Sequence, residues 1–252
     1  MRDGCAERLV PAPHGTAIFT ESLPRVWTLN VLRVEHTDAP ALELAAEAER
    51  VQGAAGLTHR RVLVTDEANG RALEEGFSEL GWKTEAFLFM AHRRRPARAV
   101  DASMVIEVER EVLASLREQI VWETLPGADQ ETALQISEAN RRFAEVGRAR
   151  HFAVTVEGRP VSAADVYSDG RTAQIEDVAT LVQYRGHGYA SAVVMRALEE
   201  ARQDHDFVFL TADSRDWPKE LYRRLGFDSL GEKFSYLLSG ASEEQPQSTA
   251  AS

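Results

Sequence analysis

Residues Arg185 to Ala190 read Arg-Gly-His-Gly-Tyr-Ala and follow a strand-like run that ends near Val182. Glycines at 186 and 188 allow the backbone to approach a ligand closely. The first amides of a helix have no intrahelical partner and can bind a phosphate group. Arg185 adds a positive charge. Two glycines alone would indicate only a plain strand–helix connection, but the whole arrangement predicts a phosphate-binding turn.

The segment after this turn predicts a helix that packs on a sheet. Its apolar residues recur at the three- and four-residue spacing of one helix face; they are Ala190, Val193, Val194, Ala197, Leu198 and Ala201. Residues 171–181, before the turn, predict a strand rich in β-formers. The turn is therefore expected where a strand's carboxyl end meets a helix's amino end.

This turn resembles the acyl-CoA pyrophosphate loop of the GNAT superfamily of N-acetyltransferases, through Arg185, Gly188 and Ala190. The later segment LYRRLGF (221–227) resembles the family's second recurring motif, in spacing and in chain order. The resemblance covers roughly residues 103–238. It implies a mixed α/β (α+β) fold whose central sheet is mostly antiparallel and flanked by helices.

The resemblance also implies acetyl-CoA as co-substrate and acetyl transfer to a primary amine of a small molecule or polypeptide, by direct attack in a ternary complex. The strand at 173–181 would separate from the strand at 207–213 and admit the pantetheine arm. Tyr222 would be the general acid that protonates the departing thiolate. The backbone of Val178, Ala179 and Thr180 would bind the arm, and the Val178 amide would polarise the thioester carbonyl. The phosphates would contact Arg185, Gly186, His187, Gly188, Tyr189, Ala190 and Ser191.

The general base is less clearly marked. Glu176 and Asp177 precede the acyl site, and strand alternation places them on opposite faces, with Glu176 on the face of Gln174 and Val178. Glu176 is therefore the candidate base, acting through water, with an ordinary exposed strand residue as the alternative. Arg215 stands where many family members have an Asn that bonds the cofactor arm.

The first half of the chain contains a short internal repeat of the second. Residues 77–90 echo residues 222–238, and both copies predict the order strand, helix, strand, helix, strand. The first copy has Phe77 in place of Tyr222, and residues 35–40 (EHTDAP) hold two acids and no glycine. We therefore expect a degenerate GNAT-like lobe without a CoA site at 1–97 and a catalytic domain at 98–238. The basic run 92–100 predicts the linker, and residues 239–252 predict a disordered tail.

Composition restricts the partners. The chain of 252 residues has a formal net charge of -11, which argues against binding to nucleic acid or an anionic membrane. Its single cysteine, Cys5, excludes an intramolecular disulfide and fits a reducing cytoplasm, and no run reaches the roughly 18 apolar residues of a membrane span. No histidine or cysteine cluster predicts a metal site. We expect a cytoplasmic monomer or homodimer.

Two other functions compete with acetyl transfer. A non-catalytic acyl-CoA-binding sensor or interaction module is the main alternative, and the retained Tyr222 favours the enzyme. A P-loop enzyme is disfavoured because no Lys-Ser/Thr pair follows the glycines. The acceptor pocket would be built from residues 110–147 and the following hairpin, with Trp122, His151 and Asp165 as its candidate residues.

Overall fold

The computed structural model describes residues 1–125 and 127–239. Residues 240–252, which form nearly all of the expected tail, lie outside this range. The first half contains α1 (Arg2–Cys5), β1 (Arg8–Ala12), β2 (Gly15–Phe19), β3 (Val31–Val34), α2 (Ala41–Ala54), β4 (Arg60–Val64), α3 (Glu67–Glu79) and β5 (Lys83–His92). The second half contains β6 (Val105–Val108), α4 (Ala114–Thr124), α5 (Gln130–Val146), β7 (Arg150–Val156), β8 (Arg159–Ser168), β9 (Thr172–Thr180), α6 (Tyr189–Asp204), β10 (Phe207–Asp213), α7 (Pro218–Arg224) and β11 (Phe227–Leu238).

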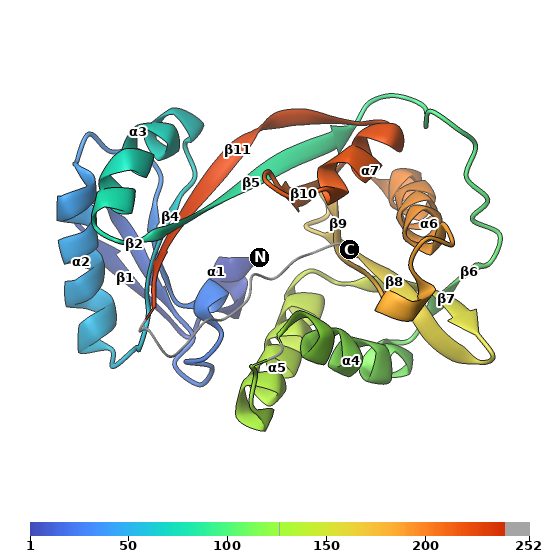
Figure 1. Ribbon diagram of the computed structural model, residues 1–252, viewed down its shortest axis with the longest axis horizontal. Helices are drawn as coiled ribbons and strands as arrows, with labels where there is room; N and C mark the ends of the chain where they lie inside the picture. Colours follow the sequence, from blue (N-terminus) through green and yellow to red (C-terminus); the bar gives the residue numbers. More distant parts are fainter. Residues whose placement is uncertain (126, 240–252) are drawn as a thin grey trace.

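All described strands form one sheet in the order β1-β2-β3-β4-β11-β5-β10-β9-β8-β7-β6 (Figure 1). Its neighbours are antiparallel except β3 with β4 and β9 with β10. Each parallel pair opens the run strand, helix, strand, helix, strand, first in β3-α2-β4-α3-β5 and then in β9-α6-β10-α7-β11. The expected mixed, mostly antiparallel fold in two related lobes is confirmed.

The two halves exchange their last strands at the centre of the sheet. β5, from the first half, pairs with β10, whereas β11, from the second half, pairs with β4. β5 and β11 also pair with each other over most of their length. The lobes are therefore joined by a two-stranded ribbon, and each lobe's sheet contains one strand from the other half. The division of the chain into a lobe at 1–97 and a domain at 98–238 stays a prediction.

The two faces of the sheet differ in chemistry. One face is apolar and packs against α2 and α3 in the first lobe and against α6 and α7 in the second. The other face carries polar residues at alternate positions of the central strands and is covered by α1, α4 and α5 (Figure 1). In β11, for instance, Phe234 and Tyr236 enter the apolar core, whereas Lys233 and Ser235 face the other way.

The β-rich run 26–34 (VWTLNVLRV) predicts a strand, no strand is predicted before residue 16, and residues 232–238 (EKFSYLL) predict the last strand. The structure differs at these three places. Trp27–Leu29 forms a short 3-10 turn rather than the start of a strand, because the buried Asn30 donates to the carbonyl oxygens of Leu23 (3.0 Å) and Val26 (3.1 Å) and holds the chain in a turn. β1 was not expected from its sequence. β11 begins at Phe227, earlier than its alternating pattern indicated. Among the described residues, no helix is both long and apolar enough to cross a membrane.

Candidate active site

The turn before α6 has the geometry of an anion-binding loop. Gly186 and Gly188 both have left-handed φ angles, 80° and 82°, and a Cβ atom at either would project into open space. Within the described residues, no backbone hydrogen bond uses an amide from Gly186 to Ser191, and the first helical bond runs from Ala192 to the Gly188 carbonyl (3.0 Å). These amides are free to bind a ligand.

Side chains stabilise this turn from within. His187 donates from Nδ1 to the carbonyl oxygens of Arg185 (2.9 Å) and Tyr184 (3.2 Å), and its ring stacks on Tyr189 with centroids 5.6 Å apart. Arg185 donates from Nε to the carbonyl of Thr180 at 3.3 Å and is otherwise exposed. Its terminal guanidinium nitrogens have no partner among the described residues and add positive charge to the exposed turn.

Next to the turn, β9 and β10 separate. They pair in parallel only from Thr172 with Phe207 to Ile175 with Leu210. Beyond that point β10 continues to pair with β5, whereas β9 continues to pair with β8. The expected divergence of these strands is therefore present, and it opens a gap whose far end lies at the turn.

A β-bulge in β9 lies at the mouth of this gap. The register with β8 shifts between Ala163–Ala179 and Asp165–Glu176, so Asp177 and Val178 have no cross-strand partner on either side. Asp177 has a positive φ of 51°, which is uncommon for a residue with a side chain. At Val178 the edge of β9 that faces β10 is therefore not paired with that strand. The carbonyl of Ala179 already accepts a hydrogen bond, from the Ser162 hydroxyl at 3.0 Å.

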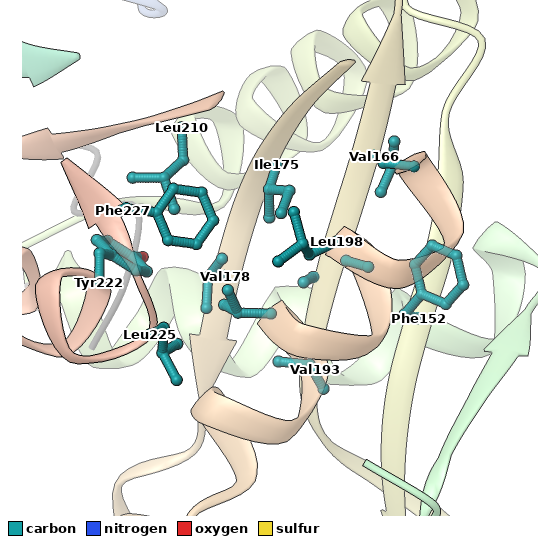
Figure 2. Packing of buried hydrophobic residues seen from close by; sticks show 14 of the residues in the cluster. Phe152, Val166, Ile175, Val178, Val193, Leu198, Leu210, Tyr222, Leu225 and Phe227 are labelled. Atoms are coloured by element: carbon teal, nitrogen blue, oxygen red, sulfur yellow. The ribbon is translucent and has the colours of Figure 1, made fainter. Parts of the chain in front are cut away.

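This bulge overturns the expectation that Glu176 and Asp177 point to opposite faces and that Glu176 shares a face with Val178. Val178 packs into the apolar core beside Ile175 (Figure 2), whereas both acidic residues line the polar side. One additional residue in a strand reverses the facing of every residue after it. Simple alternation therefore fails at Asp177.

Glu176 lies in a partly buried polar network. Its Oε1 accepts hydrogen bonds from the Gln174 amide and from the Thr211 hydroxyl (3.2 Å). Burial, and then the charge of Asp177, raise the pKa of Glu176 to about 7, against the opposing effect of Lys233. A carboxylate with this pKa can accept a proton near neutral pH.

Tyr222 approaches the same gap from the apolar side of the sheet. Its side chain is 1% exposed and packs edge-on against Phe227, with ring centroids 6.1 Å apart (Figure 2). No hydrogen bond of its hydroxyl is found within the described residues. Burial, followed by the charge of Glu176, raises the pKa of Tyr222 well above its usual value. The charge of Glu176 therefore acts on the Tyr222 hydroxyl.

A central cavity of about 460 Å³ lies on the polar face, between the sheet and the helices α1, α4 and α5. Its sheet-side lining comes from β4, β11 and β5 at the first-lobe end and from β10, β9 and β8 at the other. Glu176, Asp177 and Val178 contribute to it. The cavity and the gap therefore meet at the bulge.

A buried chain of charged groups fixes the bulge in place. Arg117 of α4 donates to Asp165 (2.5 Å) and lies 3.4 Å from Asp177, which also accepts a hydrogen bond from the Tyr167 hydroxyl (2.8 Å). Asp165 is bonded on its other oxygen by His151 Nδ1 at 2.8 Å. This network was not anticipated, although the polar residues of β8 and β9 could have indicated it.

The three residues expected in the acceptor pocket lie elsewhere. His151 and Asp165 are buried behind Arg117, which lines the cavity in their place, and Trp122 is 42% exposed on α4 outside it. Arg215, at the position of the family's Asn, points away toward Glu74 and the Thr84 carbonyl. The sequence predicted the turn and the strand separation correctly, but it did not predict which residues line the cavity.

Comparison with known proteins agrees with this description. The family model for the acetyltransferase (GNAT) family matches residues 115–227. None of the curated proteins compared with the chain matches it. Among solved structures, the chain resembles a conserved protein of unknown function from Staphylococcus epidermidis ATCC 12228, at 17% identity over 93% of this chain and 94% of that chain, with a TM-score of 0.69.

Two further structures carry acetyltransferase descriptions. One is a GCN5-related N-acetyltransferase from Kribbella flavida, with 17% identity, coverage of 94% and 91%, and a TM-score of 0.63. The other is a tandem GNAT protein from the clavulanic acid biosynthesis pathway, with 14% identity, coverage of 79% and 70%, and a TM-score of 0.53. At these identities the likeness concerns the fold.

Proposed function

We propose that the chain is an N-acetyltransferase that transfers an acetyl group from acetyl-CoA to a primary amine, because residues 115–227 match the family model for the acetyltransferase (GNAT) family. One observation carries the proposal. The gap between β9 and β10 runs from the unpaired Val178 backbone to the free amides of Gly186–Ser191. An extended thioester with a pyrophosphate at its far end has matching chemistry along its whole length.

The residues of the gap would bind acetyl-CoA as follows. The turn amides and Arg185 would hold the pyrophosphate, since a helix amino terminus and a guanidinium both favour anions. The backbone of Val178, Ala179 and Thr180 would bind the pantetheine arm. The Val178 amide would donate to the thioester oxygen, where negative charge develops during attack.

The amine would enter from the central cavity and attack the thioester carbonyl carbon, forming a C–N bond as the C–S bond breaks. Glu176 would take the proton that the nitrogen loses, through water, and Tyr222 would give its proton to the departing thiolate. The products are the acetamide and CoA thiol.

The coupling between the two groups supports these roles. The charge of Glu176 is one of the causes that raise the pKa of Tyr222. When Glu176 takes up the proton of the amine, that charge disappears and Tyr222 becomes a stronger acid. The base would thereby activate the acid at the moment when the thiolate leaves.

An acetyl-transfer screen tests the proposal. Acetyl-CoA is incubated with the protein and a panel of small amines, and release of CoA thiol is followed against a control without amine. We expect amine-dependent thiol release with at least one acceptor. Binding of acetyl-CoA without transfer to any amine would instead indicate the acyl-CoA-binding sensor, and absence of binding would refute both.

A further inference from the structure

The cations that line the central cavity differ in whether an acidic residue pairs with them. Two of its cations are matched by acids: Arg61 pairs with Glu85, and Arg117 pairs with Asp165 and Asp177. Two other cations that line it, Lys233 and Arg2, have no carboxylate within ion-pair distance among residues 1–125 and 127–239. The positive charge that remains therefore belongs to the first-lobe end of the cavity.

Lys233 belongs to β11, the strand that the second half contributes to the first lobe. Its ammonium lies over the rings of Phe87 (5.5 Å) and Phe89 (5.1 Å), so the side chain extends across β5 toward β10 and β9. Burial lowers the pKa of Lys233 to about 8, and the charges of Arg2 and Arg61 act in the same direction, whereas the charge of Glu176 opposes them. A bound anion would offset both the burial of the ammonium and its repulsion from the neighbouring cations.

Arg2 approaches the same region from the helices that cover the cavity. Its Nε donates to the Thr28 carbonyl at 2.7 Å, which fixes the guanidinium while leaving its terminal nitrogens without a described partner. Burial lowers the pKa of Arg2 to about 10, and the charge of Arg61 adds to the effect. Arg2, on helix α1, and Lys233, on the sheet, therefore act electrostatically on the same region of the cavity.

The acids without an ion-pair partner lie at the opposite end. Glu176 is on β9 and Asp213 is on β10, and both line the cavity. Three strand spacings separate β9 from β11, which corresponds to roughly 14 Å between backbones. The Lys233 and Glu176 side chains extend inward from both ends, and each charge acts on the pKa of the other group. Only a compact molecule would therefore fit between them.

We propose that the acceptor is a small amino acid-like molecule, whose amine lies at Glu176 and whose anionic group, a carboxylate or a phosphate, binds Lys233 and Arg2. The inference rests on the proposed acetyl transfer and names the substrate class for it. The volume of about 460 Å³ is within the range of small-molecule sites. The first lobe would contribute specificity rather than catalysis, because both cations lie on its side of the cavity.

Matched acceptors test the proposal with the unmodified protein. The acceptors share one amine and differ in the distal group, which is a carboxylate, a phosphate monoester or a neutral carboxamide. We expect kcat/KM for one of the anionic acceptors to exceed that for the carboxamide by about 10- to 100-fold, as expected for a charge-assisted contact. The preferred acceptor then shows whether the anionic group of the substrate is a carboxylate or a phosphate. Equal values for all three acceptors would overturn the proposal.

Lys233→Met gives the second measurement, because methionine keeps the length and removes the charge. The rates are compared well above pH 7, where Glu176 is ionised in both proteins, because loss of the Lys233 charge would raise the pKa of Glu176. At that pH the KM of the preferred anionic acceptor should rise about tenfold relative to the KM of the carboxamide. Lys83→Met, on the exposed start of β5, is the matched control and should change neither. If Lys233→Met does not fold, Lys233→Arg keeps the charge and should retain the preference for the anion.

A binding measurement separates this proposal from the proposed function. Calorimetry with the anionic acceptor, without acetyl-CoA, should detect binding to the wild-type protein and weaker binding to Lys233→Met. Amine-dependent thiol release without any preference for the anion would refute the acceptor class alone. Anion binding that depends on Lys233 without thiol release would refute acetyl transfer while the anion subsite stands.

Discussion

The connections from β3 to α2 and from β9 to α6 occupy equivalent places in the repeat, yet they use their backbone amides differently. In the first, the amide of Thr37 donates to the Asn69 side chain (3.3 Å), that of Ala39 donates to the Thr37 hydroxyl (3.0 Å), and Pro40 has no amide to offer. In the second, the amides of Gly186–Ser191 have no backbone partner in the part of the chain that the structure describes.

The strands before these connections also differ, since β3 stays paired with its parallel neighbour and β9 does not. β3 stays paired with β4 up to Val34 and Val64, and the Thr65 amide extends the ladder with a bond to the Val34 carbonyl (3.1 Å). β9 leaves β10 after Ile175. The same supersecondary unit is therefore closed in the first lobe, whereas in the second it leaves the turn amides and one strand edge unpaired. Satisfied amides and continuous pairing are what close it.

The largest expected effect comes from placing a negative charge in the open turn. Gly188→Asp should abolish measurable acetyl-CoA binding, because its carboxylate would project into the space where the phosphates are proposed to bind. Gly170→Asp is the matched control, since Gly170 also has a positive φ, 86°, and open space around a Cβ atom. Calorimetry on both folded variants checks this. Unchanged affinity in Gly188→Asp would place the phosphates elsewhere.

The second comparison concerns Tyr222 and its counterpart Phe77. Tyr222→Phe should lower kcat by on the order of 10²-fold, the low end for general acids, because a thiolate leaves fairly well unaided. The KM for acetyl-CoA should change little. Tyr236→Phe is the control: its hydroxyl donates to the Gly70 carbonyl in the first-lobe core, so it should lose about 1 kcal/mol of stability and keep its kcat. Normal kcat in Tyr222→Phe would make Tyr222 a packing residue.

Glu176→Gln should have a smaller effect that depends on pH. The base acts in its deprotonated form, so wild-type kcat should fall as the pH drops through about 7, the raised pKa of Glu176. The variant should be about tenfold slower above that pH, less than the usual range for a general base because Asp177 still lines the site, and should lose the inflection. A pH profile of kcat for both proteins tests this. The same inflection in the variant would assign it to another group.

The smallest effect on activity is expected from Phe77→Tyr, which gives the first lobe the missing hydroxyl. Phe77 is fully buried and stacks on Tyr236 with ring centroids 4.1 Å apart, so an unpaired hydroxyl there should cost about 1–3 kcal/mol of stability. kcat and the stoichiometry, one acetyl-CoA per chain, should stay unchanged. Urea denaturation and calorimetry measure the two quantities, and a second site in either protein would contradict the degenerate lobe.

The sequence by itself determined most of the elements and the glycine turn before α6. Two glycines before an amphipathic helix specify that turn locally, since positive φ angles and free helix amides need no distant contact. LYRRLGF likewise indicated the family whose model matches residues 115–227, and the matching element order indicated the repeated lobes. These features depend on residues close together in the chain, and they appeared within a few residues of their predicted bounds.

Only the tertiary structure decided which residues face the central cavity. The bulge at Asp177 breaks the two-residue period, and it is held by Arg117 and Tyr167 from other elements. The exchange of β5 and β11 carries Lys233 into a cavity shared with Arg2 and Glu176, residues far apart in the sequence. Register and strand exchange depend on long-range pairing, which the alternation of apolar residues along a single strand does not encode.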